Sequence, residues 1–166
     1  MTPRALLFAL FALSPVARTA QQGAASPIDG AWKITEIVTT GANGATNASP
    51  QPSLIMFVRG HYSWLHIGSS TPRKQRAAAA TPGKLTDAEK IAAFEEWNPF
   101  TANSGTYEIK GNTLTRRRLV AKNEFAMGAA PPVIEQYKLE GDTLWITSDP
   151  PNAQGSQTRY KLTRAR

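Results

Sequence analysis

The stretch GTYEIKGNTLTRRR, residues 105–118, contains two runs in which apolar or aromatic side chains alternate with polar ones. A period of two predicts β-strands whose two faces differ in character. The dipeptide Gly111-Asn112 between the runs is typical of the two-residue turn of a β-hairpin. The stretch therefore predicts an antiparallel strand pair, and counting outward from the turn places Tyr107 opposite Arg116.

The same alternation recurs on both sides of this hairpin, with similar turns at Arg59-Gly60 and Gly141-Asp142, whereas residues 41–53 are rich in Gly, Ala, Asn and Pro and predict a loop. Eight strands are predicted: 31–39, 54–58, 61–67, 105–109, 113–121, 133–139, 143–148 and 158–164. Short strands joined in sequence indicate an all-β, eight-stranded antiparallel up-and-down barrel. A barrel of this size encloses room for its own side chains or for one small ligand.

One helix interrupts the strands, and the sequence predicts it between strands three and four. Thr86 can cap the first turn while Glu89 returns a bond to the cap, as in a capping box. Ala88, Ile91 and Phe94 then recur at helical spacing, and Asn98-Pro99 ends the segment. We expect this helix to close or flank one end of the barrel.

The first 25 residues have the layout of a secretory signal peptide. Arg4 precedes an apolar run, 5–13, that is too short to span a bilayer, and Pro15 and small residues follow it. Cleavage after Ala20 or Ala25 would export the chain to the periplasm or secrete it, and residues 26–166 are predicted to form one barrel domain. A membrane-anchored N-terminus is the alternative, and no later segment is long and apolar enough to cross a membrane.

Charge and composition narrow the partners. Without residues 1–25 the chain keeps 17 basic and 12 acidic side chains, which mildly favours anionic partners. No nucleic-acid motif is present, which argues against a nucleic-acid partner, and no motif indicates a cofactor. The chain has no cysteine, so neither a disulfide nor a lipid anchor on cysteine is expected.

Two arginines are expected on the inner face of the barrel. The register set by Gly111-Asn112 puts Arg116 and Arg118 on the face of Tyr107, and the next hairpin puts Glu135 and Tyr137 on the same side. A buried guanidinium must be paired. Either an arginine binds the carboxylate or phosphate of a ligand, or the arginines pair with Glu135 or lie at the wet mouth of the barrel.

The strand 61–67 supplies further candidates for the cavity wall. Tyr62, Trp64 and His66 share one face, but the register against strand 54–58 stays open by one residue. His61 and His66 point to opposite faces, so no metal site is predicted. No Gly-x-Ser-x-Gly turn is present, and no catalytic residue is assigned.

Trp32 follows Gly30 at the start of the first strand, and Arg164 ends the last. In a closed barrel these strands are neighbours, so a guanidinium can stack on the indole, which contributes about 0.5–2 kcal/mol. With the segments GTY (105–107), LEGDTL (139–144) and KLTR (161–164), this ending resembles the bacterial exported lipocalin-like domain family. The resemblance implies that Trp32 and Arg164 seal one barrel end and that a small, mostly apolar molecule is bound.

The sequence as a whole favours binding of a small hydrophobic or amphipathic molecule in the barrel without its transformation, and the excess of basic side chains favours an anionic one. The predicted ligand-binding residues are Tyr62, Trp64, His66, Tyr107, Arg116, Arg118, Glu135 and Tyr137. One alternative is an enzyme for isomerisation or dehydration that uses His66, Tyr107, Arg116 or Glu135 in acid–base chemistry. Another is a structural envelope protein whose aromatic side chains fill the barrel.

Overall fold

A computed structural model describes residues 25–42, 44–75, 83–149, 151–152 and 155–166, so nearly all of the predicted signal peptide lies outside the described residues. The described part contains nine strands, one α-helix and one 3-10 helix. In chain order the elements are β1 (Gly30–Thr39), β2 (Ala45–Asn47), β3 (Leu54–Val58), β4 (His61–Ile67), α1 (Asp87–Trp97), β5 (Phe100–Lys110), β6 (Thr113–Ala121), η1 (Glu124–Ala126), β7 (Val133–Glu140), β8 (Thr143–Ser148) and β9 (Thr158–Arg164).

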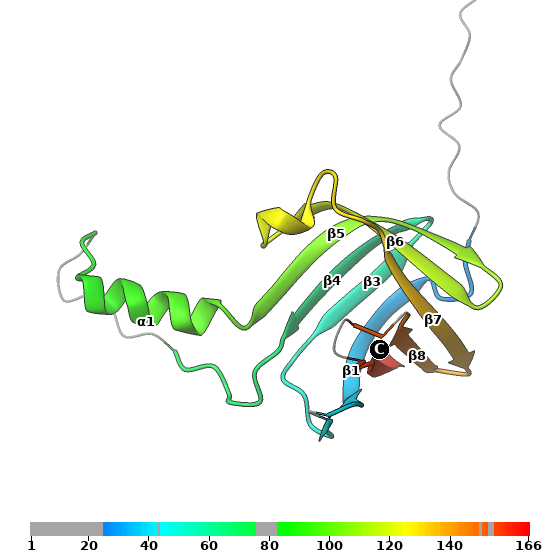
Figure 1. Cartoon of the computed structure of the whole chain (residues 1–166), viewed down its shortest axis with the longest axis horizontal. Helices are drawn as coiled ribbons and strands as arrows, with labels where there is room; N and C mark the ends of the chain where they lie inside the picture. The colour runs from blue at the N-terminus through cyan, green and yellow to red at the C-terminus, as the bar shows by residue number, and fades with distance from the viewer. Residues whose placement is uncertain (1–24, 43, 76–82, 150, 153–154) are drawn as a thin grey trace, which may run out of the picture.

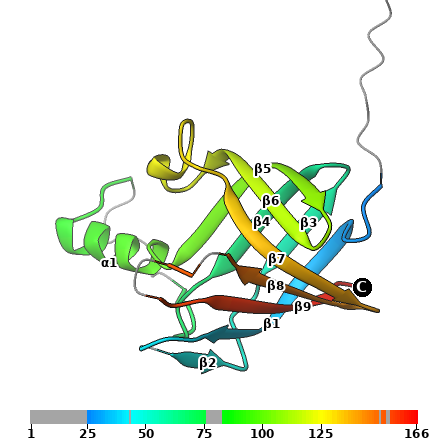
Figure 2. The ribbon, with the colours of Figure 1, turned by 45° about the vertical axis from the view of Figure 1, so that its right-hand side comes forward.

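Eight of the strands form a closed antiparallel up-and-down barrel. The order is β1-β3-β4-β5-β6-β7-β8-β9, and β9 pairs with β1 to complete the ring. Figures 1 and 2 show these strands wrapping around a common axis, with β1 beside both β3 and β9. Closure removes the free sheet edges that a flat meander would expose, and the predicted fold class is confirmed.

The position predicted for the helix is wrong by one strand. Residues 45–47 lie in the segment predicted to be a loop, but they pair with the end of β1 as the short strand β2. Consequently α1 falls between β4 and β5. The capping box is present as predicted, with Thr86 Oγ1 accepting from the Glu89 amide. However, α1 has no buried residue and extends away from the barrel instead of covering its end (Figure 1).

The strand registers set the inner face. Tyr107 pairs with Arg116 and Leu139 with Leu144, which confirms the counts from the two turns. The open register of β3 and β4 is also resolved, because Ile55 and Phe57 are the buried residues, and Ile55 pairs with Trp64. The inward residues of these strands therefore meet those of β5 and β6 inside the barrel.

A β-bulge changes the inner face of β1. Trp32 and Ile34 are buried as the alternation predicts, but the pairing with β9 skips one residue between Ile34 and Glu36. The extra residue reverses the alternation. Ile37 therefore packs against the core and pairs with Tyr160, whereas Val38, which strict alternation from Trp32 and Ile34 would place on the inner face, does not join the core.

One end of the barrel is sealed. The tight turns after β3, β5 and β7 lie here, together with the start of β1 and the end of β9. Trp32 is fully buried, its indole nitrogen donates to the Ile28 carbonyl at 2.9 Å, and the Arg164 guanidinium lies 4.3 Å from its ring centroid. Gly30 has φ +138°, and a Cβ there would collide with the Arg164 side chain. The contact expected between Trp32 and Arg164 is present.

The opposite end carries the long connections. Residues 40–53, 68–99, 122–132 and 149–157 link the strands there, and α1 protrudes from this end in Figure 2. We refer to the two ends as the sealed end and the open end. Within the described residues no helix has the length and apolarity to cross a membrane.

Candidate functional site

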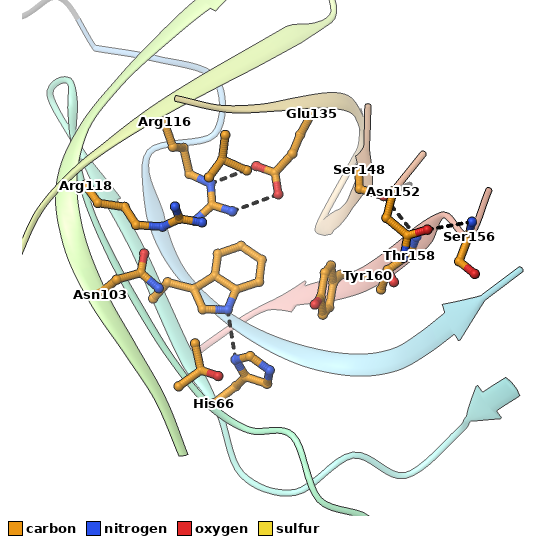
Figure 3. A pocket seen from close by; sticks show the side chains of 13 residues that line it. His66, Asn103, Arg116, Arg118, Glu135, Ser148, Asn152, Ser156, Thr158 and Tyr160 are labelled. Carbon is orange, nitrogen blue, oxygen red and sulfur yellow. Dashed lines mark hydrogen bonds and ion pairs between the residues drawn. The ribbon is translucent and has the colours of Figure 1, made fainter. Parts of the chain in front are cut away.

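A pocket of about 480 Å³ opens at the open end of the barrel (Figure 3). Its wall is built from the inward residues where β4 and β8 end and β5, β7 and β9 begin, with β6 crossing behind. Below it, Phe57, Tyr62 and Tyr107 fill the barrel with packed rings. The barrel is thus filled by its own side chains toward the sealed end and hollow toward the open end.

The floor of the pocket is an ion pair between Arg116 and Glu135. Arg116 Nε donates to Glu135 Oε2 and Nη2 donates to Oε1, both at 2.7 Å. The two side chains are 7% and 4% exposed. Burial is the largest single influence and lowers the pKa of Arg116, but the charge and hydrogen bonds of Glu135, together with Tyr62 and Tyr160, raise it overall. The two charges therefore neutralise each other.

Two aromatic rings hold the Arg116 guanidinium in place. Its Cζ lies 4.5 Å from the Trp64 ring centroid and 5.0 Å from that of Tyr62. Contacts of this kind gain strength when they are desolvated. The pKa of the Tyr62 phenol is raised, chiefly because it is buried. Arg116 is thus fixed by its carboxylate and by both rings.

One side of the pocket is a cluster of Trp64, His66 and Tyr160. Trp64 Nε1 donates to His66 Nδ1 at 3.0 Å, and the Tyr160 ring meets the Trp64 ring edge-on at 5.2 Å between centroids. Burial lowers the pKa of His66, and the nearby Arg116 charge lowers it further. Because Nδ1 accepts the hydrogen bond from the indole N–H, the neutral imidazole carries its own proton on Nε2.

Arg118 lines the mouth of the pocket and, unlike Arg116, has no partner among the described residues. In the described part of the chain its guanidinium makes neither an ion pair nor a hydrogen bond. Asn103, also at the mouth, accepts the Tyr62 hydroxyl on Oδ1 at 2.8 Å, which leaves its amide N–H groups as donors. Figure 3 shows Arg118 and Asn103 on the same side of the pocket. Donors and one uncompensated positive charge therefore converge here.

The predicted ligand-binding residues separate into two groups. Five of them line the pocket: Trp64, His66, Arg116, Arg118 and Glu135. Tyr62 lies behind Arg116, and Tyr137 packs against the core cluster. Tyr107 lies toward the sealed end, where its hydroxyl donates to Asp29; burial and this hydrogen bond raise its pKa to about 12.

This separation bears on acid–base chemistry. Tyr107 is directed away from the pocket toward Asp29. Both oxygens of Glu135 accept from Arg116, so neither residue is placed to exchange a proton with a bound molecule. Of the four groups considered for catalysis, His66 alone remains with a ring nitrogen that lacks a hydrogen bond within the described residues.

Several pocket residues were missed by the sequence analysis: Thr101, Asn103, Val133, Ser148, Asn152, Ser156, Thr158 and Tyr160. Tyr160 and Thr158 could have been found, because counting back from Arg164 in steps of two puts both on the inner face. Thr101 and Asn103 could not, since β5 begins at Phe100, five residues before the predicted start. No group of three metal-ligating side chains occurs among the described residues.

No family model matches the chain, and no curated protein matches it. Among solved structures it is similar to a lipocalin-like protein from Bacteroides uniformis, with 12% identity and a TM-score of 0.44 over 82% of this chain and 97% of that one. It is also similar to an uncharacterized protein from Bacteroides eggerthii, with 11% identity and a TM-score of 0.44 over 82% of this chain and 98% of that one. The barrel assignment rests on the strand order of this chain itself.

Proposed function

We propose that this protein binds a small amphipathic anion at the open end of the barrel and does not transform it. The observation that carries the proposal is the difference between the two arginines. Arg116 is neutralised by Glu135, whereas Arg118 at the mouth has no partner among the described residues. A guanidinium is well shaped to receive a carboxylate or a phosphate, so the uncompensated charge favours an anionic group.

The pocket supports binding over a purely structural role. About 480 Å³ lies within the usual range for sites that hold small molecules. Its wall combines the Trp64 and Tyr160 rings with the donors of Arg118 and Asn103. Apolar walls with a few placed polar groups are typical of ligand sites. A molecule with an apolar segment directly beside its anionic group matches both parts of this wall.

We also propose that the chain is an exported lipocalin-like protein. The proposal rests on the leader-like residues 1–25 and on the Trp32–Arg164 contact at the sealed end. N-terminal sequencing of protein recovered from bacterial envelope and medium tests it. A mature start near residue 21 or 26 supports export with cleavage, and a start at Met1 contradicts it.

The binding proposal is tested by titrating decanoate and decanol against three proteins in a calorimeter. These are the wild type, Arg118→Met, and the control Arg117→Met, whose side chain is exposed on the opposite face of β6. We expect Arg118→Met to weaken decanoate binding about ten- to a hundredfold, the worth of charged hydrogen bonds, while decanol binding stays unchanged. Arg117→Met should resemble the wild type. Equal decanoate affinity in all three proteins would overturn the proposal.

A further inference from the structure

A second hollow of about 690 Å³ lies outside the barrel, between the C-terminal end of α1 and η1. Its floor is the first part of β5, from Phe100 to Asn103, and its sides carry Phe94, Trp97 and Phe125. We call this hollow the groove. Figure 1 shows α1 leading into the start of β5 from the left and η1 above this part of the strand.

The groove is held in shape by Lys122. Its ammonium group donates to the carbonyls of Trp97 and Asn98 at 2.6 and 2.8 Å, and its backbone amide donates to the Ala102 carbonyl at 2.7 Å. A lysine that binds the last carbonyls of a helix satisfies groups that would otherwise have no partner. The Trp97 and Phe100 rings also meet at 5.2 Å between centroids. The end of α1 is thus attached to the barrel even though the helix buries no residue there.

The apolar side chains of the groove are exposed to an unusual degree. Phe94 is 63% exposed, Trp97 46% and Phe125 84%. They come from two elements that face each other across one hollow. Exposed apolar side chains that cluster in this way are typical of binding sites, whereas isolated ones are common on any protein surface.

The groove adjoins the pocket in the barrel. Thr101, Asn103 and Arg118 line both hollows. The Arg118 guanidinium, which has no partner within the described ranges, therefore lies where the polar pocket meets the apolar groove. A ligand whose anionic group is bound by Arg118 can extend into the groove without leaving the protein surface.

We infer that the groove holds the apolar chain of the same amphiphile whose anionic group binds Arg118, so that the ligand class is an anion with a long alkyl or similarly apolar chain. This inference rests on the proposed function. The occupant is a small amphiphile and not a second copy of the chain, because the groove joins the Arg118 charge. Each methylene buried in the groove should tighten binding about fourfold.

Quenching of tryptophan fluorescence by brominated decanoates locates the chain. Bromine quenches an indole only near contact, and Trp64 lies in the pocket wall whereas Trp97 lies in the groove. We expect decanoate brominated at its terminal carbon to quench the wild type in a saturable way. Trp97→Phe should remove most of that quenching, whereas the control Trp145→Phe, on β8 and away from both hollows, should retain it. Circular dichroism of each variant checks that the barrel is folded.

Decanoate brominated beside the carboxylate is the matched probe, and its quenching should survive Trp97→Phe. If terminal-bromine quenching survives Trp97→Phe and is lost in Trp64→Phe, the chain lies inside the barrel and the inference is wrong. The inference also fails if Arg118→Met leaves that quenching intact, because the groove would then bind chains without the charge. Absence of saturable quenching with either probe would instead contradict the proposed function itself. Sedimentation that changes from dimer to monomer in Phe125→Ser would show a second copy in the groove and would overturn the inference.

Discussion

Arg116 and Glu135 form a bidentate ion pair between the neighbouring strands β6 and β7. The two residues are diagonal neighbours, because Glu135 pairs with Leu114, two residues before Arg116. Diagonal neighbours on one face of a sheet are close enough for long side chains to meet. Both charges are buried, so neither can be left alone without a large penalty. The pair therefore fixes the register at the pocket floor, whereas Arg118 has no ion-pair partner in the described part of the chain.

Breaking this pair from one side should unfold the barrel more easily. Arg116→Met leaves a buried carboxylate without a partner, and we expect the free energy of unfolding to fall by about 3–5 kcal/mol. The double variant Arg116→Met/Glu135→Leu removes both charges and should recover most of that loss. Denaturant unfolding of both variants and the wild type gives the values. A double variant that is as unstable as the single one would show that the pair matters through its packing.

The Trp32–Arg164 contact predicts two unequal effects at the sealed end. Trp32→Ala removes a fully buried indole and should cost about 3–5 kcal/mol of unfolding free energy. Arg164→Ala should cost about 1–2 kcal/mol, because it loses the ring contact and the hydrogen bond to the Asp29 carbonyl but is one-third exposed. Chemical denaturation measures both. Equal losses in the two variants would contradict the assignment of the indole as the seal.

His66 should make stability depend on pH in the acid range. Its pKa is lowered in the folded protein by burial and by Arg116, so the unfolded chain takes up a proton first as the pH falls below about 6.5. The contribution of His66 to the free energy of unfolding is therefore fully present above that pH. It declines as the pH falls further, until the folded-state pKa of His66 is reached. In His66→Asn the amide oxygen can still accept from Trp64, and this part of the decline should be absent.

Unfolding curves at about pH 7.5 and about pH 5 test this dependence. His61→Asn, at an exposed position on the same strand, is the matched control and should keep the wild-type decline. An unchanged decline in His66→Asn would mean that other groups govern the acid range.

The fold could be predicted from the sequence because its signals are local. Each tight turn fixes the register of the two strands beside it, which is why Tyr107–Arg116 and Leu139–Leu144 were placed correctly. The bulge in β1 could not be predicted, since nothing in the alternation of residues 31–39 marks the extra residue that turns Val38 away from the core. The short strand β2 was missed for a related reason, because its three residues are stabilised only by pairing with β1.

The site could be predicted only in part, because it depends on which end of the barrel is hollow. Alternation identifies inward residues but does not distinguish Tyr107, which lies toward the sealed end, from Trp64, which lines the pocket. The sequence also did not predict that α1 extends away from the barrel. Its apolar stripe is typical of a helix that packs on a core, but here Phe94 of that stripe lines the groove together with Trp97.

Gly105 gives the last prediction, which links the fold to the pocket. It is buried on β5 and pairs with Arg118 on β6, and the register of the two strands shifts between Ser104 and Gly105. A Cβ added to Gly105 would overlap the Arg117 carbonyl oxygen on β6. Because that oxygen belongs to backbone, it cannot rotate away, so β5 and β6 must separate. We expect Gly105→Ala to lower the unfolding free energy by about 1–3 kcal/mol and, by displacing Arg118, to weaken decanoate binding. The control is Thr106→Ala, which changes the next residue on the outer face. It should lower the unfolding free energy by less than about 0.5 kcal/mol and leave decanoate affinity unchanged. Wild-type stability together with wild-type decanoate affinity in Gly105→Ala would show that the close approach of the two strands at this point is not required.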